Sequence, residues 1–575
     1  MSTRIVAALL LVGLALAGCT PPNIRGGGEG QAGGSGSGPK TLNVGIIAEP
    51  TGIGPFSSHT SGGGAHQVEE IAHRYLVGLD NRSQPYPEVA DALPSVQNGT
   101  WTIYPDGTMD TTFRIRSGVR WHDGTPMVAD DWVFGWEVDH DPLMPNFSTV
   151  PIRYIDSVTA PDDATLFMHW TQTYPFANAL LRRQVSPLQR ARHEALYKSD
   201  SDRFINSTAW SSEFIGLGPY RIGEWNQGSF IRFEAFDQYH RGRPRIDVVV
   251  VRFLQDANTL LANVLADAVD VYLPLGLEKE AARDLRNNWA AEGTGNQVLA
   301  YPDGRLRFVE VQMRPDYQRP AALSDRRTRE AIYRGLDRGE VMEGVIGGLG
   351  QVADSWVLPT DPARENEFRG LIPDYSRDLQ RGQRLMEEIG YRRGGDGIFV
   401  NAQGARFETA IWNTPGGGNA KENTIVADQL RSFGIPTEQY LIPASRLDDS
   451  EHRASFPGLS LTALTVTLDF ENARFRYRAP TRTAPLGSPR NGYENPEAIA
   501  LVDRLQVTVP ASERVQLQRQ IMQIALHELP IMPMYWDVET LTIRKGVVGP
   551  LARTGRHTNY PLSTWNIAEW DIIRS

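Results

Sequence analysis

Two patterns along the 575-residue chain predict a mixed α/β fold. Residues 41–48 (TLNVGIIA) and 245–254 are runs of apolar and β-branched side chains that are typical of buried strands. Elsewhere apolar residues recur at helical spacing, as in the stripe that Ser324 or Asp325 can cap and that reaches Val345. Strands that alternate with amphipathic helices indicate an α/β body.

Each of the other elements has a local signal of its own. Four consecutive valines within 245–254 favour a strand that is covered on both faces. A second helical stripe over 379–389 stops at Gly390, and a third opens at Ser512 and ends at Pro530. We therefore expect helices over these segments as well.

Composition bounds the kind of protein. The chain has 58 Lys and Arg against 68 Asp and Glu, a net charge of −10, and 41% of its residues are hydrophobic. This apolar content excludes general disorder, and the acidic balance argues against nucleic acid as a partner. A single cysteine excludes an internal disulfide and a Cys-based zinc site. At roughly 100–200 residues per domain, the length indicates about three domains or one composite body.

The amino terminus is predicted to be a targeting segment. Arg4 precedes the apolar residues 5–17, a stretch too short to span a bilayer and typical of a signal peptide over residues 1–18. It ends in Leu-Ala-Gly-Cys19, which resembles the lipobox of bacterial lipoproteins and implies that Cys19 is lipid-modified. The alternative is an ordinary secretory signal with an incidental cysteine. Residues 19–40 are rich in Gly and Ser, so we expect a flexible linker that tethers an extracytoplasmic body to the cell membrane, on the periplasmic or outer surface.

No catalytic motif stands out. HExxH, GxxxxGK[ST] and GxSxG patterns are absent from the sequence, and the 11 histidines show no metal-ligand spacing. The pair His122-Asp123 lies in WHDGTP, a turn sequence, and we assign it to the turn rather than to acid–base chemistry. The sequence therefore predicts a binding protein with no metal and no cofactor; a secreted lipid-anchored hydrolase is the remote alternative.

Seven short segments, in order, resemble one protein family. The densest match is residues 111–136 (TTFRIRSGVRWHDGTPMVADDWVFGW). The others are 87–90, 216–220 with 236–239, 256–258 with 267–270, 324–337, 434–435 and 530–535. On these residues the chain resembles the extracellular solute-binding proteins of family 5, the dipeptide- and oligopeptide-binding lipoproteins of ABC importers.

The resemblance implies a two-lobed, periplasmic-binding-protein-like fold in which lobes joined by a hinge close over the ligand. Chain order in the family places lobe one at 41–80, 206–300 and 545–575, an extra domain on it at 81–205, and lobe two at 301–544. The resemblance further implies a monomeric receptor that captures a peptide and delivers it to permease and ATPase subunits of an ABC importer. A family 5 receptor for a non-peptide solute (oligosaccharide, metal complex or haem) and a sensor-coupled receptor stay open.

The resemblance also implies a ligand segment. In peptide-binding members a stretch of the form A-G-W-x-x-D-Y pairs with the peptide backbone, and its Asp meets the ammonium group. Here it corresponds to 464–470 (LTVTLDF), with Asp469 at the ammonium position and Thr465, Val466 and Thr467 beside the backbone. Thr465 replaces Gly and Val466 replaces Trp, so the ligand need not be a standard peptide. Alternatively the stretch is a core strand and Asp469 a strand-end turn residue.

Five further residues are ligand candidates. Glu49 and Pro50 follow the first strand, where family members turn into the cleft. Trp412 and Asn413 resemble the end of a strand that borders the site, although Trp412 also fits an ordinary half-buried aromatic. Arg453 precedes the ligand segment and can meet a carboxylate, although an arginine on a solvated loop is the commoner case.

Overall fold

A computed structural model describes residues 38–55, 62–144, 150–180, 184–467, 470–482, 484–552 and 563–573. Residues 39–575 form one compact unit. The predicted signal peptide, Cys19 and all but the last three residues of the predicted linker lie outside the described residues, and so does Asp469. Among the residues that are described, no helix is both long and apolar enough to cross a membrane.

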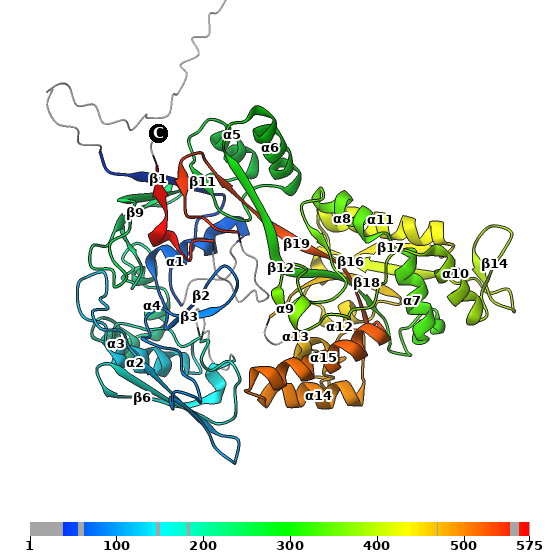
Figure 1. Cartoon of the computed structure of the whole chain (residues 1–575), viewed down its shortest axis with the longest axis horizontal. Helices are drawn as coiled ribbons and strands as arrows, with labels where there is room; N and C mark the ends of the chain where they lie inside the picture. The colour runs from blue at the N-terminus through cyan, green and yellow to red at the C-terminus, as the bar shows by residue number, and fades with distance from the viewer. Residues whose placement is uncertain are drawn as a thin grey trace, which may run out of the picture. The chain divides into compact units, whose positions relative to one another are not determined.

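An 11-stranded mixed sheet forms the centre of the protein (Figure 1). β1 (Thr41–Ile46) pairs in parallel with β10 (Val248–Phe253) and with β11 (Val271–Tyr272), which confirms the two predicted strands. The strand order is β17-β16-β18-β12-β19-β11-β1-β10-β9-β8, and β13 pairs with β19. The remaining bounds are β8 (Tyr220–Asn226), β9 (Phe230–Ala235), β12 (Gln297–Val311), β13 (Gln351–Val352), β16 (Thr409–Asn413), β17 (Thr437–Leu441), β18 (Leu459–Thr465) and β19 (Ile531–Ile543).

β12 and β19 are long antiparallel partners that run from one hydrophobic core to another. At one end Tyr301 and Leu541 belong to the core built on β1 and β10, whereas at the other Val309 and Met532 belong to the core of the second lobe. Their pairing shifts register between Pro302 and Leu306, so the ladder is interrupted midway. The two strands therefore connect the two lobes.

Helices cover both faces of the sheet in the second lobe. One core lies beneath α7 (Arg326–Gly335), α8 (Arg338–Ile346), α10 (Leu379–Glu388) and α11 (Gly417–Phe433). The core on the opposite face, around Leu306 and Phe308, lies against α9 (Pro362–Asn366), α13 (Phe470–Phe475), α14 (Pro496–Val507) and α15 (Ala511–Glu528). Two shorter elements, α12 (Ser450–Ala454) and the hairpin of β14 (Arg392–Arg393) with β15 (Phe399–Val400), complete this lobe.

The helical stripe predicted from Ser324 or Asp325 onward is two helices rather than one. Asp325 caps α7. A second carboxylate, that of Asp337, accepts a hydrogen bond from the Glu340 backbone N–H at 3.0 Å and caps α8. The prediction of one helix was wrong because a capping residue inside the stripe begins a new helix.

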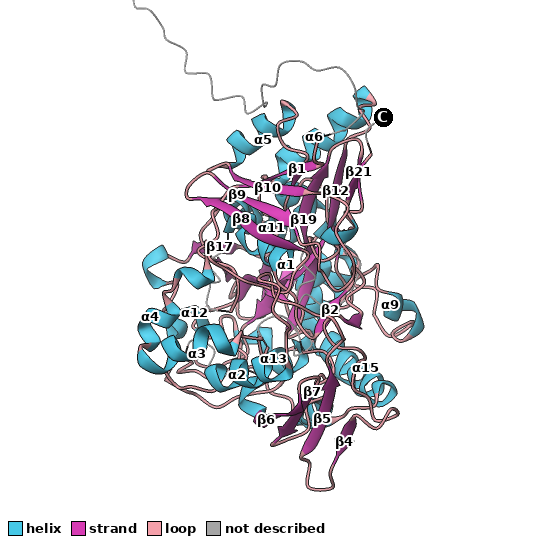
Figure 2. Cartoon of the chain, turned by 90° about the vertical axis from the view of Figure 1, so that its left-hand side faces the viewer, coloured by secondary structure: helices cyan, strands magenta, loops and turns pink. Residues whose placement is uncertain are grey.

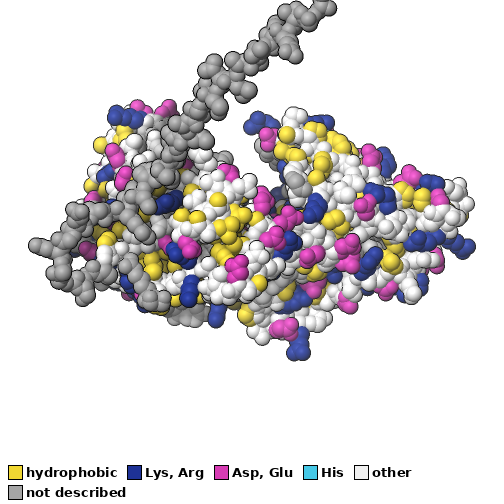
Figure 3. Space-filling model, turned by 90° about the horizontal axis from the view of Figure 1, so that it is seen from above, with side chains coloured by type: hydrophobic (Ala, Val, Ile, Leu, Met, Phe, Trp, Pro, Cys, Tyr) yellow, Lys and Arg dark blue, Asp and Glu magenta, His cyan; other side chains and the backbone are white. Residues whose placement is uncertain are grey.

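The first lobe carries a small separate sheet with the order β4-β5-β7-β6 (Figure 2). Its strands are β4 (Trp101–Ile103), β5 (Met109–Arg114), β6 (Ile155–Asp162) and β7 (Thr165–Trp170), and α2 (Ala129–Asp139) packs on them. The other elements of this lobe are α1 (Glu69–Ala72), β2 (Val77–Leu79), β3 (Pro85–Pro87), α3 (Arg190–Ser199), α4 (Ser201–Ile205), α5 (Ala257–Leu265), α6 (Lys279–Glu292), β20 (Val547–Val548) and β21 (Asp571–Ile572). On the face seen from above, acidic and basic side chains are interspersed (Figure 3).

His122 has a structural role. Its ring Nδ1 accepts the Gly216 backbone N–H at 3.1 Å, and its Nε2 lies 3.1 Å from the Gly218 carbonyl, to which the neutral ring donates. Burial lowers the pKa of His122 to about 4, so the ring stays neutral. A Cβ at either glycine would fall within 2.3 Å of the Ala72 backbone, so these positions need glycine.

Candidate ligand-binding site

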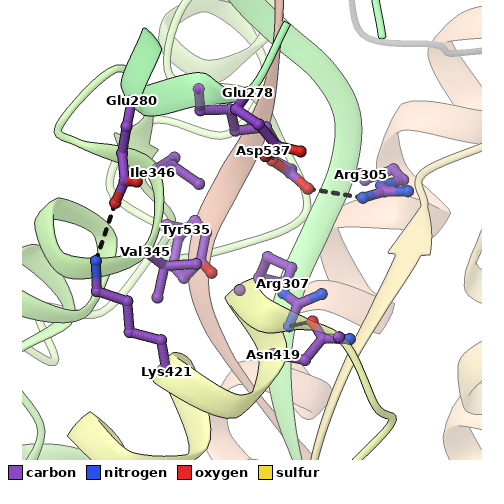
Figure 4. Close-up of a pocket in the computed structure, with 13 residues that line it drawn as sticks. Glu278, Glu280, Arg305, Arg307, Val345, Ile346, Asn419, Lys421, Tyr535 and Asp537 are labelled. Atoms are coloured by element: carbon purple, nitrogen blue, oxygen red, sulfur yellow. Dashed lines mark hydrogen bonds and ion pairs between the residues drawn. The ribbon is translucent and has the colours of Figure 1, made fainter. Parts of the chain in front are cut away.

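A pocket of about 680 Å³ opens where β12 and β19 connect the lobes (Figure 4). Its volume lies within the range of small-ligand sites. Both lobes contribute side chains, and more than half of the lining residues are charged. The lining residues are Glu278, Lys279, Glu280, Arg305, Arg307, Val345, Ile346, Gly416, Gly418, Asn419, Lys421, Tyr535 and Asp537.

Ion pairs join the two sides of this pocket. Lys279, at the start of α6, pairs with the buried Asp537 of β19, and the Arg305 Nη2 lies 2.7 Å from the other oxygen of that carboxylate. Burial opposes ionisation of Asp537, but the charges of Lys279 and Arg305 outweigh it and lower its pKa to about 2. Glu280 of α6 also accepts from the Lys421 Nζ of α11, at 3.0 Å. The α6 side of the pocket is therefore held to β19 and α11 by charge.

A buried network fixes the other side. Arg307 forms an ion pair with Glu422, whose side chain is fully buried, and also donates to the Asn419 Oδ1 at 3.0 Å. Glu422 further accepts from the Tyr535 hydroxyl at 2.9 Å and from the Asn413 Nδ2 at 3.1 Å. This places the sequence candidate Asn413 inside a structural network at the start of α11.

The predicted ligand segment leaves β18 beside the register break of β12. Thr465 is opposite Arg305, a residue of the pocket, and the Val466 backbone N–H donates to the Gly304 carbonyl at 2.9 Å. The Val466 side chain is buried in the core around Phe308, whereas Thr465 and Thr467 are half-buried. The described part of the segment thus pairs with the strand that carries Arg305, and none of its residues lines the pocket itself.

Glu49 and Pro50 lie elsewhere, in a pocket of about 430 Å³ in the first lobe. The two carboxylate oxygens of Glu49 accept the Trp225 Nε1–H at 2.7 Å and the Gly228 backbone N–H at 2.8 Å. The Glu49 carboxylate therefore holds the loop that follows β1 against the β8–β9 hairpin.

Trp412 and Arg453 lie in the second lobe, away from the lining of the 680 Å³ pocket. The Trp412 ring is half-buried and packs against Tyr440 and His452, with ring centroids 4.5 and 4.9 Å apart. Arg453, on α12, donates from Nη1 to the Leu447 carbonyl at 3.3 Å. The sequence candidates that the structure describes are therefore spread over several places.

Sequence reasoning missed the charged residues of the pocket, because they come from segments far apart in the chain. Arg307 and Glu422, for example, are separated by 115 positions. One signal was available: charged residues alternate with apolar ones at Arg305-Leu306-Arg307 and at Asp537-Val538-Glu539, inside otherwise apolar strands. Arg307, Asp537 and Glu539 are buried, and buried charges need partners, so they mark places where such partners converge.

Within the described ranges, no group of three or more His, Cys, Asp or Glu residues is placed to hold a metal ion. The pocket instead offers paired charges, amide groups and aliphatic side chains at a junction between two lobes. Such a lining suits the binding of a polar solute.

Comparisons with known proteins agree with this architecture. The model of the bacterial extracellular solute-binding proteins, family 5, matches residues 87–476, more than half of the chain. The oligopeptide-binding protein AppA of Bacillus subtilis is 24% identical over 433 residues, which cover 74% of this chain and 72% of AppA. OppA of the same organism, also an oligopeptide-binding protein, is 22% identical over 582 residues, which cover 95% of this chain and 96% of OppA.

Solved structures show the same fold. AppA of Bacillus subtilis in complex with a nonapeptide has a TM-score of 0.64 and 20% identity, and the match covers 93% of this chain and 100% of AppA. NikZ of Campylobacter jejuni in complex with Ni(L-His) has a TM-score of 0.65 and 19% identity, covering 92% of this chain and 99% of NikZ. The chain therefore belongs to the bacterial extracellular solute-binding proteins of family 5.

Proposed function

We propose that this protein captures a peptide between its two lobes and delivers it to the membrane subunits of an ABC importer. One observation carries the proposal: β12 and β19 connect two separate cores, and their pairing is interrupted between Pro302 and Leu306. A break in a two-strand connection confines bending to a few residues, which is what hinge closure over a ligand requires. The oligopeptide-binding relatives support a peptide as the solute.

The proposed lobes keep the boundaries expected from the sequence, with lobe two at 301–544 and the extra domain at 81–205. Lobe one comprises the remaining segments of the body. We also propose that Cys19 carries the lipid that holds the protein at the membrane, a modification that the mass of the mature amino-terminal peptide tests directly.

Native mass spectrometry of the protein purified from its host tests the solute. We expect co-purifying masses that differ by amino-acid residues, released on mild unfolding. A single non-peptide mass would instead favour the second candidate, a family 5 receptor for another small solute. Thr465 favours this candidate, because its side chain stands where peptide-binding members have glycine.

Asp469 is proposed to bind the ammonium group of the peptide. In Asp469→Asn we expect affinity for peptides with a free amino terminus to fall about thirtyfold or more, because truncating one partner of a buried charge pair costs at least about 2 kcal/mol. Affinity for the N-acetylated peptides should be equal in the two proteins. Isothermal titration calorimetry measures both.

Asp448→Asn is the matched control, since Asp448 is an exposed carboxylate in a turn of lobe two. It should leave both affinities unchanged. Equal losses for free and acetylated peptides in Asp469→Asn would contradict the proposed contact and assign Asp469 to the strand-end turn.

A further inference from the structure

A third pocket, of about 240 Å³, lies in lobe two between α12, α13 and the loop 484–490. Two arginines, Arg474 and Arg490, line it together with Ser450 and Ser488. Its small volume suits one charged group rather than a whole solute.

Among the residues that the structure describes, the charged groups that act on Arg490 in this pocket are two arginines and one carboxylate. Arg474 donates from Nη1 to the Glu310 Oε1 at 2.6 Å, and that carboxylate is buried. The Nε atoms of Arg474 and Arg453 are both buried, and neither has a hydrogen-bond partner among the described residues. Within the same described ranges, Glu310 is the one carboxylate whose charge acts on Arg490.

The electrostatics of Arg490 agree with this imbalance. Burial lowers the pKa of Arg490, and the charges of Arg453 and Arg474 lower it further, while Glu310 acts in the opposite direction. A cation whose charge is disfavoured by burial and by neighbouring cations gains most from an added anion.

The loop that forms one wall is held in place. The Arg314 guanidinium donates to the carbonyls of Leu486, Pro489 and Arg490 at 2.6, 2.8 and 2.9 Å. A backbone bridge between Arg478 and Ser488 adds two hydrogen bonds to the same loop. The wall is thus preorganised, which lowers the cost of binding.

We infer that this pocket binds a carboxylate or phosphate group, and that this group belongs to the captured solute. The assignment to the solute rests on the proposed function. It is supported by position, because α13, whose Ala473 and Arg474 line the pocket, begins at Phe470, the last residue of the predicted ligand segment. The receptor would then select acidic peptides.

Isothermal titration calorimetry of the full mature protein tests the inference with three probes. They are inorganic phosphate, a pool of Glu-containing tetrapeptides with free carboxyl termini, and a pool of Gln-containing tetrapeptides with amidated termini. In Arg490→Met we expect affinity for phosphate and for the acidic pool to fall at least tenfold, with the neutral pool unchanged. Arg482→Met, which removes an exposed arginine before the same loop, is the control and should change none of the three.

Each result decides between sources of the anion. If Arg490→Met weakens phosphate alone, the pocket binds a free anion and its assignment to the solute is overturned. If the wild-type protein binds phosphate but neither peptide pool, the anion pocket stands while the proposed function fails. If phosphate at millimolar concentration and the acidic pool bind equally to wild type and Arg490→Met, or bind to neither, the inference is overturned. Arg453→Met is measured with the same probes in case Arg490→Met does not fold. The thermal unfolding midpoint of every variant is compared with that of the wild-type protein to verify folding.

Discussion

Glu422→Gln is expected to lower the free energy of unfolding by about 3–5 kcal/mol, because it leaves the buried Arg307 guanidinium without its charge partner. Glu422 is fully buried, and Arg307 is 8% exposed. The hydrogen bonds that Tyr535 and Asn413 donate to position 422 come from neutral groups, so they do not compensate the lost charge. Urea denaturation, followed by the fluorescence of the tryptophans, measures the change.

Two comparisons isolate the buried charge. Asp396→Asn breaks the pair between Asp396 and Arg406, whose side chains are 46% and 50% exposed, and should cost no more than about 1 kcal/mol. The double variant Arg307→Met/Glu422→Gln removes both charges and should recover a large part of the loss. A loss below about 1 kcal/mol in Glu422→Gln would show that the pair is not a stabilising element of lobe two.

Two strands of the central sheet could be predicted because their signals are local. The run TLNVGIIA and the four valines of 248–251 need no distant partner to read as buried strands, and both are strands of the central sheet. The predicted helix from Asp325 was too long, because the apolar stripe continues across the end of α7 into α8. Asp337 was the available signal, because a capping residue after Gly335 begins a new helix.

The pocket could not be predicted in the same way. Arg307, Glu422 and Tyr535 meet only after β12, α11 and β19 have packed together, and no spacing in the sequence joins them. The densest family segment, around His122, proved to organise backbone in the first lobe. The resemblance thus identified the family, whereas the charged residues that line this pocket could be found only once the folded structure was known.

Asp303→Asn is expected to change how stability depends on pH. Asp303 lies in the register break of β12 and is 6% exposed. Burial raises its pKa, and the charges of Asp537 and Glu539 raise it further, to about 7, while Arg305 acts in the opposite direction. The side chain still accepts the Arg305 backbone N–H, at 2.7 Å, and an asparagine can keep this bond.

The sign follows from the raised pKa. The folded state holds the Asp303 proton more tightly than the unfolded state, whose pKa is near the ordinary value of 3.8. Its stabilising contribution is therefore complete below about pH 4 and is lost as the pH rises through 7. Asp537, with its pKa lowered to about 2, is ionised in both the folded and the unfolded state above about pH 5. Its contribution to stability is therefore constant in that range.

Between about pH 5 and pH 8 the wild-type protein should therefore lose about 2–3 kcal/mol relative to Asp303→Asn, since one pKa unit corresponds to about 1.4 kcal/mol. Urea denaturation of both proteins at the two pH values measures this difference, and groups common to both, including the histidines, cancel. Asp91→Asn, at an exposed position of the first lobe, should follow the wild-type protein at both pH values. An Asp303→Asn difference that is the same at both pH values would mean that Asp303 is ionised in the folded protein, with Arg305 outweighing its burial and its acidic neighbours.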